Sequence, residues 1–538
     1  MSLRERMEAQ AGERLDFDGI IRDAVALLKG EKEIPGLDPD ELREQLLQGF
    51  SHILVDEYQD IDQDQYELVS AIAGRTLEEG DGRLAILAVG DDDQNIYAFR
   101  GANVQFIRRF QEEYTCGTVC LVENYRSSNH IIQAANRLIA GNRDRMKREQ
   151  PIRIDRLRQS EPAGGSWAER DPLAQGRVQR LRVGNHCQQS QAVYAEMMRL
   201  KSLDPSLDWA DFAMLGRTRA LVDGVRAFLE DKQVPARVGL SSGLPLQRVR
   251  EVHRFLLALR RIEKEIRRAS ELAVHLARRA GEGGSDWAAM LEAWHTDYLL
   301  ETTDTELPVS CFIEWLYEAI AEQRREKTVG RGVVLSTVHG AKGLEFGHVF
   351  ILDGDWRRTL EAQRREEERR LLYVGLTRAR QTLCLMEMEE NGNPFLPEMD
   401  GPWMLTRRVA PQAGGDDRLT SRRYDLLSLA DINLGYAGRF PEGHAIHKRL
   451  AALGAGDSLR LAAVGEDVEL QTVDGFCVAK LSAKGSLKWS GRLGEIADAK
   501  IIAMVQWFAD SSKEEYRSHL KADAWEVPLV ELAVCEAQ

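Results

Sequence analysis

The sequence has little of several features that mark particular classes of protein. It contains 7 cysteines in 538 residues, an odd and small number that argues against a disulfide framework and for a reducing compartment. No apolar run approaches the roughly 18 residues that a membrane span needs. The first twenty residues also lack the apolar core of a secretory signal. We therefore expect a cytoplasmic protein without a membrane partner.

A surplus of positive charge is also absent. Lys and Arg number 72 against 86 Asp and Glu, which gives a formal net charge of −14. This balance excludes a globally basic surface that would hold nucleic acid without selectivity, although it is compatible with local basic grooves. With 43% apolar and 29% charged residues, the composition is that of a globular protein long enough for several domains.

The sequence does contain short apolar runs that each end in polar residues. The runs lie at 53–55, 84–89 and 119–122. Asp56 and Glu57 directly follow the first run, and helical patterns separate the runs from one another. Brief buried strands between helices are typical of a parallel α/β sheet, in which ligands bind at the carboxyl ends of the strands. We therefore expect an α/β fold with functional residues after the strands.

The later part of the chain changes its pattern three times. Residues 251–325 are helical in pattern, and the α/β pattern returns at 333–335 and 348–352, so we interpret the helical block as an insertion. Pro and Gly become frequent over 391–415, as in a linker. The last hundred residues alternate apolar and polar residues in short strands, for which we expect a small β-barrel or sandwich.

Five polar clusters carry residue types suited to nucleotide and nucleic-acid chemistry. They are DEYQD at 56–60, GDDDQNIYAFRGA at 90–102, NYRSS at 124–128, STVHGAKGLEF at 336–346 and EEERRLLYVGLTRAR at 366–380. Adjacent carboxylates after a strand can hold Mg²⁺ and accept a proton from water. Aromatic residues beside a base suit stacking on unpaired nucleobases, and a His, Lys and Gly-rich loop suits phosphate contact. The alternatives are a helix N-cap for the carboxylates and core packing for Tyr97 and Phe99.

In this order and spacing, the five clusters resemble the motifs of the UvrD/Rep family of superfamily 1 DNA helicases, over residues 15–385. The resemblance implies RecA-like motor domains, ATP and Mg²⁺ as cofactors and single-stranded DNA as a partner. It also implies 3′-to-5′ movement and roles in repair or recombination. A nuclease-bearing relative fits less well, because no DYK-type metal signature follows the motifs.

The resemblance implies a role for each matching residue. Asp56 would hold the Mg²⁺, and Glu57 would be the base for the water that attacks the γ-phosphate. Gln94 would contact the γ-phosphate, and Arg126 and Arg378 would act as arginine fingers. The residues implied to bind adenine and ribose are Tyr125 and Glu345. The residues implied to face single-stranded DNA or its phosphates are Tyr97, Phe99, Arg100, His339 and Lys342. The family usually has Trp where this chain has Phe99, a smaller ring for stacking.

The family's first motif, the Walker A loop G-x-x-x-x-G-K-[ST], has no counterpart, since the sequence contains no Gly-Lys dipeptide. We expect this loop and its strand to precede residue 1. We then expect the chain to be the C-terminal portion of an ATP-dependent DNA helicase or translocase. We expect it to be inactive alone. A polypeptide that supplies the missing motor segment is an expected partner. The alternative is a non-hydrolysing DNA-binding or scaffold subunit. A retained base and two fingers favour the first reading.

The motif positions predict the domain boundaries. We expect a partial first RecA-like domain over 1–112, a second over 113–250 and 331–390, and a shortened helical insertion over 251–330. We expect a linker over 391–423 and a β-rich C-terminal domain over 424–538. Without a central strand, the first two runs would expose unpaired edges, so residues 1–110 are expected to be the least stable part.

Overall fold

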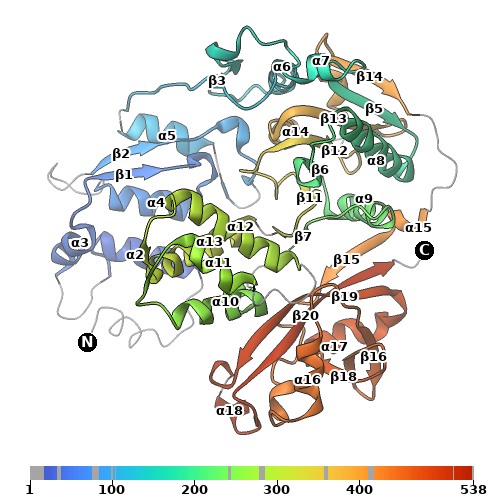
Figure 1. Ribbon diagram of the computed structural model, residues 1–538. Coiled ribbons are helices and arrows are strands. Elements are labelled where there is room, and N and C mark those ends of the chain that lie inside the picture. Colours follow the sequence, from blue (N-terminus) through green and yellow to red (C-terminus); the bar gives the residue numbers. More distant parts are fainter. Residues whose placement is uncertain are drawn as a thin grey trace.

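The computed structural model describes residues 17–32, 38–74, 84–98, 101–102, 104–114, 116–239, 244–277, 285–326, 328–356, 361–409, 417–512 and 514–535. In these ranges the chain forms a small parallel sheet near the N-terminus, a larger parallel sheet, a helical block and a β-rich C-terminal part (Figure 1). The parallel sheets agree with the expected α/β fold. None of the described helices combines the length and apolarity that a membrane crossing requires.

Six parallel strands form the larger sheet, in the order β11-β6-β12-β13-β5-β14. They are β5 (Val178–Val183), β6 (Phe212–Gly216), β11 (Val334–Thr337), β12 (Phe346–Ile351), β13 (Ala379–Met388) and β14 (Met404–Arg408). The four helices that cover the sheet are α6 (Asn129–Ile139), α8 (His186–Leu203), α9 (Arg219–Asp231) and α14 (Ala362–Leu376). Alternate side chains of β6 enter opposite cores. Leu215 packs with residues of α6 and α14, and Met214 with residues of α8 and α9.

The N-terminal sheet has only two strands among the described residues. β1 (His52–Val55) pairs in parallel with β2 (Ala85–Ala88). The helices around it are α2 (Phe17–Leu28), α3 (Pro39–Leu47), α4 (Gln63–Ile72) and α5 (Gln105–Tyr114). Tyr58, Tyr66 and Phe110 form its small core, but Leu54 is 75% exposed and Leu87 57% exposed. Among the described residues, one face of this sheet is therefore open to water. A sheet of two strands is only marginally stable by itself.

The third apolar run differs from its prediction as a buried strand. Within the described chain, only Glu123–Asn124 of this region form a strand, β3, which pairs with β4 (Arg153–Ile154). Val119 is 84% exposed and Leu121 82% exposed. Among the described residues, only the end of the run meets another strand, where the Arg153 N–H of β4 donates to the carbonyl of Val122 at 2.8 Å. The side chains of Val119 and Leu121 therefore remain open to water.

The helical block packs against the C-terminal part of the chain. Its helices are α10 (Arg250–Arg260), α11 (Ala269–Ala277), α12 (Asp286–Thr302) and α13 (Val309–Glu326), with the short strands β8 (Ile266–Arg267) and β9 (Leu307–Pro308) between them. Trp287 and Phe312 share a core with Val505. The Trp287 Nε1–H also donates to the carbonyl of Ile502 at 2.7 Å. Helices α10 to α13 therefore form a unit anchored to the β-rich part.

The β-rich C-terminal part consists of two antiparallel three-stranded sheets with one shared core, an arrangement closer to a sandwich than to a barrel. One sheet contains β15 (Arg422–Leu426), β20 (Ala524–Cys535) and β19 (Ile496–Phe508), and the other contains β16 (Arg460–Val464), β17 (Asp467–Gln471) and β18 (Cys477–Lys480). A buried ion pair ties this part to α9, with Arg226 Nη1 at 2.8 Å from Glu531 Oε1.

One boundary moves. β14 lies inside the range 391–423 that was predicted as a linker, and it pairs with β5. The larger sheet therefore extends past residue 390. The Pro and Gly residues of 392–402 precede this edge strand, and those of 411–415 lie outside the described residues.

His348 gives the fold a pH dependence that can be measured. Its side chain is fully buried on β12 between Trp167 and Phe212, with ring centres 5.0 and 5.1 Å away. Burial lowers the pKa of His348 to about 4. An unfolded histidine titrates near 6.5, so between these values only the unfolded chain takes up the proton, and stability falls as the pH drops through this window. We expect a loss of about 2 kcal/mol between pH 7 and pH 5 in denaturant titrations.

The variant His348→Phe should lose most of this pH dependence, because it has no group to protonate. His519→Gln, at an exposed position, serves as the control and should keep the dependence of the unmodified chain. The same pH slope in His348→Phe as in the control would contradict the assignment.

Candidate functional site

The loop after β1 presents the two adjacent carboxylates. Asp56 and Glu57 are both exposed, and Asp56 Oδ1 accepts the backbone N–H of Glu57 at 2.8 Å. Glu57 has φ 51° and ψ 39°, a left-handed conformation that is unfavourable for a residue with a β-carbon. Its carboxylate accepts the side-chain N–H of Gln59. The sharp turn directs the chain away from the strand end, and Tyr58 and Gln59 are buried directly after it.

Lys342 connects the loops of the N-terminal sheet with the larger sheet. Its Nζ contacts the carboxylate of Asp60 and donates to the carbonyl of Gln94 at 2.9 Å. It also lies 3.6 Å from Glu57 Oε2, and its side chain is only 7% exposed. Burial raises the pKa of Asp60, and the ammonium group of Lys342 opposes that rise. This buried ion pair fixes the distance between the two sheets' loops.

Arg378 approaches the same loop from the end of α14. It is 2% exposed, and its Nη2 lies 3.3 Å from Gln94 Oε1. Carbonyl oxygens of Val374 and Leu344 hold the rest of the guanidinium, at 2.9 and 3.2 Å. Burial, with a smaller effect of the nearby Arg126, lowers the pKa of Arg378 to about 10. The group therefore remains charged at neutral pH, and its contact with Gln94 is charge-assisted.

Arg126 and Glu345 form an ion pair beside this contact. Arg126 Nη1 also lies 3.4 Å from the carbonyl of Thr377, the residue before Arg378. Glu345 Oε1 is 3.6 Å from Arg380. Tyr125, next to Arg126, is 69% exposed, so its ring is open to a stacking partner.

The remaining DNA-facing candidates divide into described and undescribed residues. The Tyr97 hydroxyl donates to the carbonyl of His339 at 3.4 Å, and the two rings lie 6.3 Å apart. Phe99 and Arg100 lie outside the described residues. Lys342 lies 5.2 Å from the Tyr97 ring centre. The Lys342 ammonium group is already paired with the carboxylate of Asp60.

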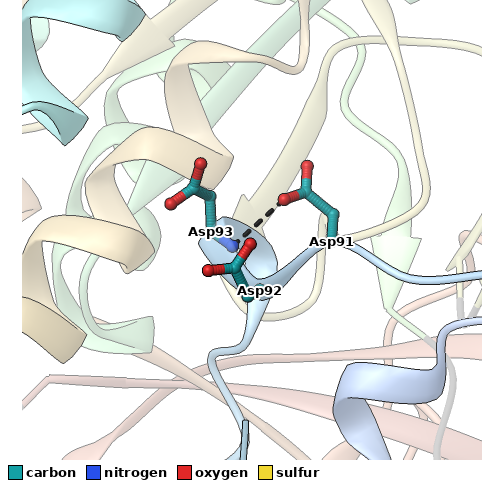
Figure 2. Close-up of side chains that lie close together, drawn as sticks. All are labelled: Asp91, Asp92 and Asp93. Atoms are coloured by element: carbon teal, nitrogen blue, oxygen red, sulfur yellow. Dashed lines mark hydrogen bonds between the residues drawn. The ribbon is translucent and has the colours of Figure 1, made fainter. Parts of the chain in front are cut away.

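Sequence reasoning did not anticipate the partners of the acidic loop Asp91–Asp93. Figure 2 shows the three side chains together, with the Asp93 N–H donating to Asp91 at 3.0 Å. One carboxylate oxygen from each lies within 4.8 Å of the others, a grouping that could hold a metal ion. The grouping has basic partners, however. Arg145 makes two bonds of 2.7 Å to Asp93, and Lys147 lies 2.6 Å from Asp91. The only hint in the sequence was that both segments are strongly charged.

The site therefore brings together most of the residues implied by the motifs. Lys342 and Arg378 each contact Gln94, Glu57 lies 3.6 Å from Lys342, and the Arg126–Glu345 pair adjoins Arg378 through Thr377. Asp56 and Tyr125 are exposed beside this group. We call the contacts among Gln94, Lys342 and Arg378 the inter-sheet junction.

Comparisons with known families match both halves of this site. A model of the UvrD/REP helicase N-terminal domain matches residues 3–115, and a model of the UvrD-like helicase C-terminal domain matches residues 293–390. The first range contains the loops after β1 and β2, and the second contains Lys342, Glu345 and Arg378. Both matched segments, and the motifs within them, are similar to the UvrD/Rep family of superfamily 1 DNA helicases.

Individual relatives agree with this assignment. DNA helicase II of Escherichia coli is 28% identical over 452 residues, which cover 70% of this chain and 61% of the relative. ATP-dependent DNA helicase UvrD2 of Mycobacterium bovis is 28% identical over 428 residues, 75% of this chain and 55% of the relative. UvrD1 of Mycobacterium tuberculosis is 39% identical over 140 residues, 26% of this chain and 17% of the relative. The chain thus spans about three fifths of the length of DNA helicase II.

The Lys342–Asp60 pair can be tested by a double-mutant cycle. Lys342→Met should destabilise the chain by roughly 2 kcal/mol, because it leaves the half-buried carboxylate of Asp60 without its cation. Asp60→Asn should soften the effect of Lys342→Met, so the double variant should be more stable than the sum of the single changes predicts. Chemical denaturation of the four proteins measures this coupling. Strictly additive effects would show that the pair does not hold the two loops together.

Proposed function

We propose that this chain is the C-terminal portion of an ATP-dependent DNA helicase or translocase that moves 3′ to 5′ on single-stranded DNA. The inter-sheet junction is the observation that carries the proposal. At this junction Gln94, in the loop after β2 of the N-terminal sheet, contacts Arg378, a buried cation from the larger sheet. A scaffold that binds DNA without hydrolysis has no need for a charged group buried at this position.

The proposed nucleotide roles follow from the contacts of each group. Asp56 is exposed and suited to hold Mg²⁺, and Glu57 is exposed beside it and suited to take a proton from water. Arg126 and Arg378 come from the other sheet, as fingers across a cleft must. Tyr125 offers an open ring to adenine, and Glu345 adjoins it through Arg126. When bound, Mg²⁺ and ATP supply the phosphoanhydride and the charge that these groups stabilise.

Coupling to DNA would run through the loop after β2. Gln94 and Tyr97 belong to the same short loop, and Tyr97 contacts His339, which precedes Lys342 in its own loop. A shift of Gln94 on nucleotide binding would therefore move the residues proposed to stack on and contact single-stranded DNA: Tyr97, Phe99, Arg100 and His339. A DNA contact by Lys342 would require it to leave Asp60.

The chain's own residues supply a base and two fingers but no phosphate cradle. A Walker A loop holds the β- and γ-phosphates with its backbone N–H groups and a Lys, and the sequence contains no Gly-Lys dipeptide. We therefore propose weak ATP binding and little hydrolysis by this chain alone.

A polypeptide that carries the missing motor segment is the proposed partner. Leu54 and Leu87 occupy matching positions on neighbouring strands, paired in register, and both are largely exposed. Val89 is also 47% exposed. Further strands and helices from such a partner would bury these exposed apolar side chains of the two-stranded sheet.

ATP turnover of the chain alone tests the proposed inactivity. We expect turnover at background level, with or without single-stranded DNA, because positioned fingers cannot compensate for a missing cradle. A coupled phosphate-release assay measures it, and Glu57→Gln serves as the matched blank. DNA-stimulated turnover that depends on Glu57 would contradict the proposal.

Hydrogen exchange tests the proposed exposure of the N-terminal sheet. Amides of β1 and β2 should exchange faster than those of β12, which is buried throughout and paired on both sides. Limited proteolysis should also cut first within residues 1–110. Slower exchange in β1 and β2 than in β12, or a first cut elsewhere, would show that this sheet is already covered.

A further inference from the structure

A pocket on the larger sheet's side of the molecule shares only Arg126 with the function proposed above. Its volume is about 680 Å³, within the range of small-molecule sites. It lies between the start of α6, the start of β13 and the loop that leads into α7 (Trp167–Arg170), three elements near one another at the top of Figure 1. Residues 155–177, which form much of its wall, contain none of the helicase motifs.

Hydrogen bonds hold the three walls of this pocket in place. The His130 N–H of α6 donates to the carbonyl of Ala163 in the loop at 3.0 Å. The Ser128 N–H donates to the carbonyl of Arg380 at 3.1 Å, and Trp167 Nε1 to Gln381 Oε1 at 2.7 Å. The pocket is therefore a built feature of the fold and not a gap between loosely packed loops.

Three guanidinium groups line the pocket: Arg126, Arg158 and Arg380. Two carboxylates, Glu161 and Glu169, also line it, and Glu161 is paired with Arg158 at 3.1 Å. Each guanidinium has five N–H donors in a planar fork, which suits phosphate oxygens. Arg380 has one carboxylate near it, Glu345, at 3.6 Å. The lining thus offers three guanidinium groups and two carboxylates, while Glu345, which the pocket lining does not include, pairs with Arg126 and Arg380.

The N-terminus of α6 adds a buried hydroxyl to the same wall. Ser128 is the N-cap residue, yet its hydroxyl makes no capping bond. The residue is only 2% exposed and lines the pocket, and its Oγ has no hydrogen-bond partner among the described residues. A buried hydroxyl without a partner costs free energy unless something satisfies it. The dipole of α6 also favours an anion at this end of the helix.

The loop brings its backbone close to this wall. Gly165 has φ +59°, in the left-handed region, and a β-carbon there would lie 3.6 Å from Ser128 Cβ. Gly164 packs on the backbone of Gln175, where a β-carbon would come within 2.2 Å of the carbonyl oxygen. Glycines at both positions keep the loop close to the start of α6.

We propose that this pocket is a second anion site, which binds a phosphate-bearing small molecule of the size of pyrophosphate or a nucleoside diphosphate. Ser128, Arg158 and Arg380 would contact the phosphate groups. The site does not depend on a Walker A loop, on Asp56 or on hydrolysis. It is therefore distinct from the proposed nucleotide cleft, with which it shares only Arg126.

Pyrophosphate, titrated calorimetrically into the full chain without Mg²⁺, is the first probe, with ADP and inorganic phosphate as further arms. We expect saturable pyrophosphate binding that Arg158→Gln and Arg380→Gln each weaken roughly tenfold. The matched control is Arg156→Gln, on the same segment, where the side chain is 77% exposed and contacts Glu123. It should bind like the unmodified chain. No saturable binding, or equal binding by all variants, would overturn the proposal.

Two further measurements keep the test decisive. Arg158 also holds the carbonyls of Tyr125 and Ser127, at 2.9 and 3.3 Å. Circular dichroism must therefore show that Arg158→Gln is folded, and if it is not, the half-exposed Arg380 carries the test alone. Tyr125→Ala separates the two sites. If it weakens ADP but not pyrophosphate, the second site stands, and if it abolishes pyrophosphate binding, the anion lies in the nucleotide cleft and the proposal is wrong.

Discussion

The buried ammonium group of Lys342 is the constraint on which the arrangement of the site depends. A cation that is 7% exposed needs a carboxylate and further oxygen acceptors, and here both come from the opposite sheet, from Asp60 and Gln94. Their positions follow from the ends of β1 and β2. The loops of the two sheets are therefore held at contact distance, which brings Arg378 to Gln94. This pair therefore helps to hold the residues of the motifs on one shared surface.

A second charged contact supports the first from the other side of the same loop. Asp93 and Asp91 bind Arg145 and Lys147, while α14 holds the segment before them, with Arg369 Nη1 at 2.6 Å from Asn142 Oδ1. The loop after β2 thus has one anchor on each side of Gln94. The net negative charge of the chain is compatible with nucleic-acid chemistry, because local basic grooves can form on a chain whose total charge is negative.

The sequence predicted the strand ends and the clustering of the motifs well, because both depend on local patterns. The apolar runs before Asp56 and Gly90 are strands, and Gln94, from the second motif, lies against Arg378, from the fifth. Three features escaped prediction because they depend on distant partners. Val119 and Leu121 have the composition of a buried strand but no described neighbour, β14 joins the sheet from a Gly-rich segment, and the Asp60–Lys342 pair spans 282 residues.

The most direct measurement of the central claim is ATP turnover after a Walker A segment is restored. The part of DNA helicase II that precedes its region of similarity to this chain would be fused to the N-terminus of this chain. The fusion would then be assayed with single-stranded DNA. If this chain supplies the base and the fingers, the fusion gains DNA-stimulated turnover, and Glu57→Gln or Arg378→Ala in the fusion lowers it by about 10³-fold or more. A folded fusion without ATP turnover, or with turnover that neither substitution changes, would contradict the claim that this chain supplies the base and the fingers.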